Sequence, residues 1–167
     1  MTMRPGVTLR QATADDAPTI AEIWHLGWRD GHLGFVPQEL VAARHEGSFR
    51  TRAAQRVGDT TVAVVDGEVA GFVMVVGDEV EQVYVSARHR GTGVADTLLA
   101  EAERQIAQAG HPTAWLAVVA GNTRARRFYE RRGWSDAGPF HYAAAGGDGP
   151  ISVPARRYVK HLTQVAR

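Results

Sequence analysis

The stretch YVSARHRGTGVADTLL, residues 84–99, joins a β-branched run to an apolar segment of helical spacing through a basic turn. Gly91 and Gly93 let backbone N–H groups approach a ligand without a Cβ atom in the way. The helix that follows points the positive end of its dipole at the same turn. Arg88 and Arg90 add charged hydrogen-bond donors. The stretch therefore predicts a diphosphate site, and the alternative is a turn whose arginines are only solvated.

The spacing of this turn excludes two other phosphate-binding motifs. A Walker loop needs Gly-x-x-x-x-Gly-Lys-Ser/Thr, and the dinucleotide fingerprint needs a third glycine three residues after Gly93, where Asp96 stands. Cysteine is absent, which excludes disulfides, thiolate metal sites and a cysteine nucleophile. The histidines are scattered without metal-ligand spacing, and no Gly-x-Ser-x-Gly element occurs. We therefore expect no metal site and no serine hydrolase.

Length and charge limit the class of protein. A chain of 167 residues with 44% hydrophobic content predicts a single domain spanning residues 1–167. Lys and Arg total 19 against 18 Asp and Glu, a net charge of +1 that favours neither nucleic acid nor an anionic membrane as partner. The N-terminus MTMRPGVTLRQAT lacks the apolar core of a signal peptide. We therefore expect a soluble cytoplasmic protein.

Hydrophobic periodicity predicts alternating strands and helices. Asp66 and Gly67 give the strongest hairpin signal, between two apolar runs within residues 60–77, and the run 79–85 adds a third strand to an antiparallel meander. The nearly unbroken apolar strand at 113–120 is expected to be buried and parallel to its neighbour. The other predicted elements are a strand at 7–12, a helix at 13–28 with a break at 31–34, a helical stretch from Pro37 to about Val57, helices at 94–109 and 123–132, a loop at 141–155 and a last strand at 156–162.

Two motifs in the right order carry a resemblance to a known family. RHRGTG, residues 88–93, resembles the Arg/Gln-x-x-Gly-x-Gly/Ala signature of the GCN5-related N-acetyltransferase (GNAT) superfamily, and it stands between a strand and a helix as that signature does. AWLAVVAGNTRARRFYERRGW, residues 114–134, is similar to the family's next strand and helix, and the hairpin at 66–73 fits too. The resemblance implies an α/β (α+β) fold, with a mixed central sheet of about six to seven strands that is flanked by helices and splayed between strands four and five.

The resemblance also implies acetyl-CoA as co-substrate, with its pyrophosphate on the glycine turn. Backbone N–H groups of Val83 and Val85 would hold the pantetheine arm and polarise the thioester carbonyl, which requires a bulge or splay in the sheet. Asn122 is both a predicted N-cap and an implied contact of the pantetheine arm. The full implied coenzyme site comprises Val83, Tyr84, Val85, Arg88, His89, Arg90, Gly91, Thr92, Gly93, Val94, Ala95, Asn122, Arg126, Phe128 and Tyr129.

Three residues are candidates for the catalytic chemistry. By resemblance, Tyr129 donates a proton to the departing sulfur, and its alternative role is core packing. Side-chain alternation predicts that Glu79 and Glu81 share one strand face with Val83 and Val85, from which either glutamate would deprotonate the amine. The alternatives are ordinary exposed carboxylates and an ordered water as the base.

The acceptor is expected to enter opposite the coenzyme, between the first helices and the late loop. Trp28, His32, Phe35 and His141 are the candidate substrate-binding residues. We expect a primary amine of a small molecule, such as an amino acid, an antibiotic or a polyamine, to attack directly in a ternary complex, since no cysteine is present to carry an acyl group. A protein or peptide N-acetyltransferase, and a non-catalytic acyl-CoA-binding sensor domain, are the alternatives. A homodimer, common in the family, is also open.

Overall fold

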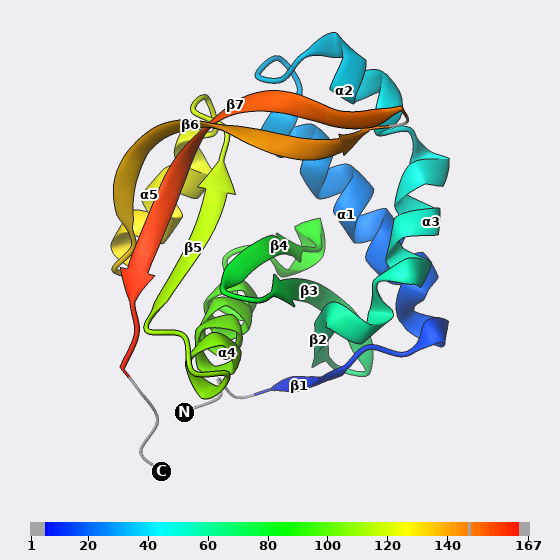
Figure 1. Cartoon of the computed structure of the whole chain (residues 1–167). Helices are drawn as coiled ribbons and strands as arrows, with labels where there is room; N and C mark the ends of the chain where they lie inside the picture. The colour runs from blue at the N-terminus through cyan, green and yellow to red at the C-terminus, as the bar shows by residue number, and fades with distance from the viewer. Residues whose placement is uncertain (1–5, 147, 164–167) are drawn as a thin grey trace.

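The computed structural model describes residues 6–146 and 148–163, and its strands form one seven-stranded sheet in the order β1-β2-β3-β4-β5-β7-β6 (Figure 1). The strands are β1 (Val7–Gln11), β2 (Thr60–Val65), β3 (Glu68–Val76), β4 (Glu79–Val85), β5 (Thr113–Val118), β6 (Ser135–Gly146) and β7 (Gly149–His161). β4 and β5 are parallel, and every other neighbouring pair is antiparallel. The mixed sheet and its flanking helices confirm the predicted fold class.

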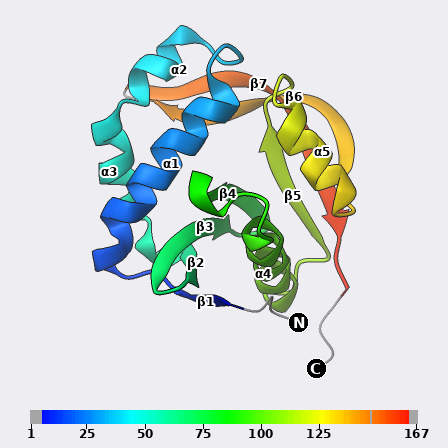
Figure 2. The ribbon, with the colours of Figure 1, turned by 180° about the vertical axis from the view of Figure 1, so that it is seen from behind.

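Helices cover both faces of this sheet. They are α1 (Ala17–His32), α2 (Gln38–Ala43), α3 (Glu46–Gln55), α4 (Val94–Gln108) and α5 (Thr123–Arg131), with short 3-10 helices η1 (Ala14–Asp16), η2 (Val57–Asp59) and η3 (Ala87–His89). The views in Figures 1 and 2 show α1, α2 and α3 on one side and α4 and α5 on the other. Among the helices of the described residues, none has the length and apolar character needed to cross a membrane.

Local chemistry explains where these elements begin and turn. Asp66 and Gly67, with φ of 51° and 79°, both take the left-handed conformation of a tight two-residue hairpin, which confirms the predicted β2–β3 turn. The carboxylate of Asp16 accepts hydrogen bonds from the backbone N–H of Thr13 at 2.8 Å and from the guanidinium of Arg10 at 2.7 and 2.9 Å. These bonds fix the approach of β1 to α1.

The core has two clusters, one on each face of the sheet. On the α1 side, the ring of Trp24 lies 5.6 Å from that of Phe49 and 5.9 Å from that of Phe72, and all three side chains are fully buried. On the α4 side, Leu98 and Ile106 pack against β3 and its neighbours. Burying each such side chain contributes about 1.5–3 kcal/mol. Side chains therefore pack on both faces of the central strands, which fixes the position of β4.

β4 carries a bulge on its β3 side. Met74 pairs with Gln82, whereas the next residue of β3 pairs with Val80, so Glu81 is an extra residue in β4. A bulge interrupts the simple alternation of side chains and re-aims the residues next to it.

On its other side, β4 separates from β5. The ladder between these parallel strands holds one pair, Glu79 opposite Trp115, beyond which the strands diverge, as Figure 1 shows. The splay predicted between strands four and five is therefore confirmed. The later β4 residues face a gap instead of a neighbouring strand.

The segment 141–155 is expected to be a loop, but its residues 141–146 belong to β6 and its residues 149–155 to β7. Tyr142 pairs with Val153, and the pairing continues to the hairpin's end. Pro154 is tolerated because this half of β7 extends beyond β5, whose pairing with β7 involves only residues 156–161. The glycines and prolines of this segment favour a loop, although the buried positions of β7 alternate as in a strand.

Two helix boundaries also differ from expectation. α1 continues to His32, so Gly31 lies within the helix and not in a break. The stretch expected as one helix to about Val57 divides at Arg44, after which the imidazole of His45 accepts the N–H of Ser48 and caps α3. Arg44 is thereby held between two short helices.

Candidate active site

The glycine turn opens into a cavity of about 690 Å³, here called the glycine-turn cavity. Gly91 and Gly93 have φ of 76° and 88°, and Gly93 is the N-cap of α4. A Cβ atom at Gly91 would meet nothing within 4 Å, so the backbone of this turn is open to a ligand. The predicted residues that line this cavity are Val83, Tyr84, Val85, His89, Arg90, Gly91, Gly93, Ala95, Asn122, Phe128 and Tyr129.

Four other predicted coenzyme residues have side chains engaged elsewhere. Arg88 pairs with Glu68 at 2.9 Å on the surface. Arg126 donates to the hydroxyl of Tyr158 at 3.1 Å, to the carbonyl of Ala120 at 3.0 Å and to the carboxylate of Asp136 at 3.3 Å. The hydroxyl of Thr92 donates to the carbonyl of His89, and Val94 is in the core, 1% exposed. These side chains do not line the glycine-turn cavity.

Three cationic residues outside the predicted coenzyme site also belong to this cavity, and for one of them, Arg124, the sequence favours a solvated helix face. Arg124, Arg131 and Arg132 line it, at the side formed by α5. Arg132 is fixed by an ion pair with Asp96 of α4 and by its stacking over the ring of Phe128, with 5.2 Å from its Cζ atom to the ring centroid. The signal was present as an arginine-rich helix, but its sequence did not indicate which arginines face the turn.

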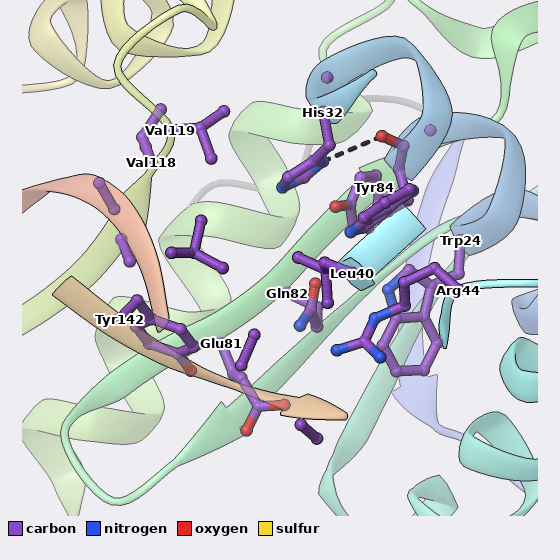
Figure 3. Close-up of a pocket in the computed structure, with 18 of the residues that line it drawn as sticks. Trp24, His32, Leu40, Arg44, Glu81, Gln82, Tyr84, Val118, Val119 and Tyr142 are labelled. Atoms are coloured by element: carbon purple, nitrogen blue, oxygen red, sulfur yellow. Dashed lines mark hydrogen bonds between the residues drawn. The ribbon is translucent and has the colours of Figure 1, made fainter. Parts of the chain in front are cut away.

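A second cavity, of about 750 Å³, lies between α1, α3, β4, β5 and β6 (Figure 3), and is here called the arginine cavity. Val83, Tyr84, Asn122 and Tyr129 line both cavities. The two cavities therefore meet at the gap between β4 and β5.

Two glycines of α1 keep this meeting point open. A Cβ atom at Gly27 would overlap the ring of Tyr84, and one at Gly31 would lie 2.9 Å from Nδ2 of Asn122. Both glycines line both cavities. Asn122 uses Oδ1 to accept the N–H of Ala125 at 3.2 Å, which leaves its Nδ2 on the side of the gap.

Tyr129 presents a protonated hydroxyl at the gap. Its ring packs 5.4 Å from Phe128 and 6.2 Å from Trp134, which fixes its direction. Burial raises the pKa of Tyr129 to about 12, so the phenol is neutral near pH 7 and remains a hydrogen-bond donor. Burial also raises the pKa of Tyr84, and the two phenols are electrostatic neighbours.

The structure separates Glu79 and Glu81 from the valines of β4. Val83 and Val85 pack toward the α4-side cluster, although Val83 also borders the arginine cavity. Both glutamates line that cavity together with Tyr84, whose ring packs on the α1-side cluster. The expectation that all four share one face is wrong, because the bulge at Glu81 shifts the alternation.

The two glutamates have different partners. Glu81 is held by Arg56 through bonds of 2.6 and 3.1 Å to its two oxygens. Glu79 accepts a bond of 2.7 Å from the hydroxyl of Tyr142. Burial raises the pKa of Glu79, assisted by the negative charges of Glu81 and Asp78, and the Tyr142 bond partly opposes this shift. Glu79 therefore holds a proton more readily than an exposed glutamate does.

Two of the four predicted acceptor residues line the arginine cavity. Trp28 and His32 stack with ring centroids 4.9 Å apart, and Nδ1 of His32 lies 2.9 Å from the carbonyl oxygen of Trp28. Burial lowers the pKa of His32, so its ring is neutral near pH 7. Phe35 lies over Gly121, and His141 bonds Ser152 at 3.1 Å on the outer side of the hairpin, so neither lines this cavity. Tyr142, the next residue of β6, lines it instead.

Two arginines of this cavity escaped sequence reasoning. Arg44 and Arg52 line it from the α2–α3 connection and from α3. Their sequence context, a polar helical stretch, resembles a solvated surface. Only the packing of α3 against α1 turns these side chains inward.

Comparison with known proteins identifies the family. A sequence model described as the acetyltransferase (GNAT) family matches residues 18–134. An uncharacterized N-acetyltransferase of Mycobacterium tuberculosis (strain ATCC 25618 / H37Rv) is 31% identical in an alignment of 109 residues that covers 56% of this chain and 70% of that protein. The chain belongs to the GNAT family; it is an acetyltransferase, and its co-substrate is acetyl-CoA.

Solved structures share the fold. A GCN5-related N-acetyltransferase from Rhodopseudomonas palustris has a TM-score of 0.73 at 21% identity, covering 97% of this chain and 99% of that one. The PaiA N-acetyltransferase from Thermoplasma acidophilum, solved with coenzyme A, has a TM-score of 0.71 at 17% identity, covering 93% and 98%. The acetyltransferase YncA from Salmonella typhimurium, described as putative and solved with acetyl-CoA, has a TM-score of 0.67 at 18% identity, covering 96% of each chain.

Proposed function

We propose that this enzyme transfers the acetyl group of acetyl-CoA from the glycine-turn cavity to the primary amine of a small molecule in the arginine cavity, by direct attack. The observation that carries the proposal is the meeting of the two cavities at the gap between β4 and β5, where Tyr84, Asn122 and Tyr129 line both. Two reactants that enter from opposite sides would come together only there.

The glycine-turn cavity fits the coenzyme. Its open turn offers backbone N–H groups and a helix N-terminus to a diphosphate, and Arg124 and Arg131 add positive charge. Arg90 also lines this cavity, where it pairs with Asp30 at 2.7 Å. Among the described strands, none pairs with the β4 backbone at Val83 and Val85 on the side of the gap, so this backbone is free to bond the pantetheine arm and the thioester oxygen. When bound there, acetyl-CoA supplies an activated acetyl thioester.

We assign the base to Glu79. The amine must lose a proton as its nitrogen forms a bond to the carbonyl carbon and the carbon–sulfur bond breaks. Glu79 faces the arginine cavity with a raised pKa, which suits a proton acceptor working near neutral pH. Glu81 is instead engaged on both oxygens by Arg56, at 2.6 and 3.1 Å. Glu79 acts directly or through one water.

We assign the proton donor for the leaving sulfur to Tyr129. Its hydroxyl makes no hydrogen bond to another described residue and it lines both cavities. The pKa of about 12 keeps the phenol protonated until a thiolate forms. The proton then passes to the sulfur, and Tyr129 regains it from water.

A thiol-release assay tests this function. Acetyl-CoA is incubated with the enzyme and with amino acids, aminoglycosides, polyamines and short peptides, and the acetylated product is identified by mass spectrometry. We expect turnover on a small amine and none without an acceptor. Turnover confined to peptides would mean that the acceptor is a polypeptide and not a small molecule. Coenzyme binding without turnover on any class would contradict the proposed transfer.

A further inference from the structure

We propose that the acceptor is an amine that also carries an oxyanion, a carboxylate or phosphonate, which Arg44 and Arg52 bind in the arginine cavity. This inference rests on the proposed function and narrows its substrate class. Amino acids and aminophosphonates fit it, whereas polyamines and aminoglycosides do not.

Arg44 is placed in the cavity wall by its backbone. Its N–H donates to the carbonyls of Leu40 at 3.0 Å and Val41 at 3.2 Å, which closes α2 and fixes the residue between the two helices. The whole residue is only 7% exposed, yet it lines the cavity (Figure 3). Its charge is felt by His32 and Tyr84, which lie on the α1 and β4 sides of the same space.

Arg52 approaches the same space from α3. Ser48, Arg52 and Arg56 are spaced four residues apart, so they share the helix face that lines the cavity. The Cζ atom of Arg52 lies 4.4 Å from the ring centroid of Trp24, a cation–π contact that fixes the guanidinium group. Arg44 lies near enough to lower the pKa of Arg52, which burial and this like charge bring to about 10.

Neither guanidinium group forms an ion pair with a carboxylate of the described residues, although the negative charge of Glu81 acts on Arg52. Of the carboxylates that line the cavity, Glu81 is engaged on both oxygens by Arg56, and Glu79 is bonded to Tyr142. Within residues 6–146 and 148–163, neither Arg44 nor Arg52 forms an ion pair or a side-chain hydrogen bond. The buried indole N–H of Trp24, in the same wall, also lacks an acceptor in the described part of the chain.

Unpaired buried charge is costly, and two neighbouring like charges increase the cost. An anion between Arg44 and Arg52 would remove it and form charge-assisted hydrogen bonds, which are strongest to planar or tetrahedral oxyanions. Tyr84 lies beside these arginines and also lines the gap. One small molecule would therefore hold its oxyanion on the arginines and its amine toward the gap and Glu79.

Matched acceptors test the inference. L-amino acids are compared with their primary amides and with the corresponding 1-aminoalkylphosphonic acids by thiol release, using the native enzyme and the variants Arg44→Gln and Arg52→Gln. Arg50→Gln is the control, because Arg50 is exposed on the same helix. Thermal melting verifies that each variant folds. If Arg44→Gln does not fold, the test relies on Arg52→Gln, because Arg52 is only partly buried.

We expect an amino acid or its phosphonic analogue to show at least 10-fold higher kcat/KM than the amide with the native enzyme. The preference for the anion should fall at least 10-fold in Arg44→Gln and Arg52→Gln and persist in Arg50→Gln. Titration of coenzyme A-loaded protein with the N-acetylated acid and its amide should show the same preference without turnover. Equal use of acid and amide, with turnover intact, would overturn the inference alone. Loss of turnover on every amine would instead overturn the proposed function.

Discussion

The hydroxyl of Tyr142 donates a hydrogen bond of 2.7 Å to Oε2 of Glu79 and so joins the β6–β7 hairpin to the first residue of β4. Glu79 is also the β4 residue that pairs with Trp115 of β5, and the two strands diverge beyond this pair. The base assigned to the reaction therefore sits at the corner where the sheet opens. Its partner comes from a hairpin far along the chain.

Glu79→Gln should lower kcat by about 100-fold or more, since general-base catalysis contributes roughly 10²–10⁴-fold. Burial of Glu79 disfavours its charge, so a neutral glutamine should not reduce the free energy of unfolding at pH 7. Glu81→Gln should act in the opposite way, because it leaves Arg56 without its main partner and destabilises the fold. Steady-state kinetics and urea denaturation measure the two effects, and similar losses of kcat in both variants would contradict the assignment.

Tyr142→Phe should move the acidic limb of the kcat/KM profile to higher pH. The Tyr142 bond stabilises the carboxylate of Glu79 and lowers its pKa, so removing the hydroxyl raises that pKa further. Activity, which requires the unprotonated carboxylate, then begins at higher pH. A pH–rate profile of the two proteins decides the point, and an unmoved or downward-shifted limb would mean that the limb belongs to another group.

Tyr129→Phe should reduce kcat by about 10-fold or more while leaving the dissociation constant of acetyl-CoA within about threefold. The hydroxyl acts as the sulfur leaves, whereas the ring contacts with Phe128 and Trp134 survive the substitution. Tyr84→Phe, at the other phenol that lines both cavities, is the comparison. A larger loss of kcat in Tyr84→Phe would mean that Tyr84, and not Tyr129, donates the proton to the leaving sulfur.

Gly91→Asp should weaken acetyl-CoA binding by about 10-fold or more, because it adds a negative charge beside the phosphates. Gly110→Asp is the matched control. Gly110 also has a positive φ, 96°, and open space around it, but it lies beyond the other end of α4. Isothermal titration measures the affinity of each variant for acetyl-CoA. An equal effect of the two substitutions would mean that the glycine turn does not bind the coenzyme.

Asp16→Asn should lower the free energy of unfolding at pH 7 by about 1–2 kcal/mol. This is less than the pKa shift alone would give, because solvent at the exposed Arg10 screens the ion pair. The hydrogen bonds from Arg10 lower the pKa of Asp16 to about 2, against 3.8 for the free group. The depressed pKa means that this stabilisation is complete well above pH 3.8 and is lost as the pH falls toward 2. Urea denaturation at pH 7, 4 and 3 should show the difference between the two proteins narrowing, and a constant difference would contradict this.

The sequence predicted local structure where short-range chemistry decides it. Asp66 and Gly67 specify their turn through backbone conformation, and the apolar spacing after Gly93 specifies α4. The sequence of residues 141–155 predicts a loop, because its small residues and prolines form strand only through the pairing of β6 with β7. Local propensity contains no information about such a partner.

The candidate site was predictable only in part for the same reason. The glycine turn follows from a motif, whereas the side of β4 that Glu79 faces depends on one extra residue in the pairing with β3. Arg44 and Arg52 lie in a polar stretch with no motif, and they face a cavity only because α3 packs on α1. Tertiary packing, and not residue type, distinguishes them from the exposed Arg50.

Initial-rate kinetics with both substrates varied tests the central claim of direct transfer across the gap. Once an acceptor is identified, thiol release is measured over a grid of acetyl-CoA and amine concentrations, and double-reciprocal plots are drawn for each fixed amine concentration. Direct attack in a ternary complex predicts lines that intersect, and no acetylated protein in mass spectra of enzyme incubated with acetyl-CoA alone. Parallel lines together with an acetylated enzyme that passes its acetyl group to the amine would contradict the account.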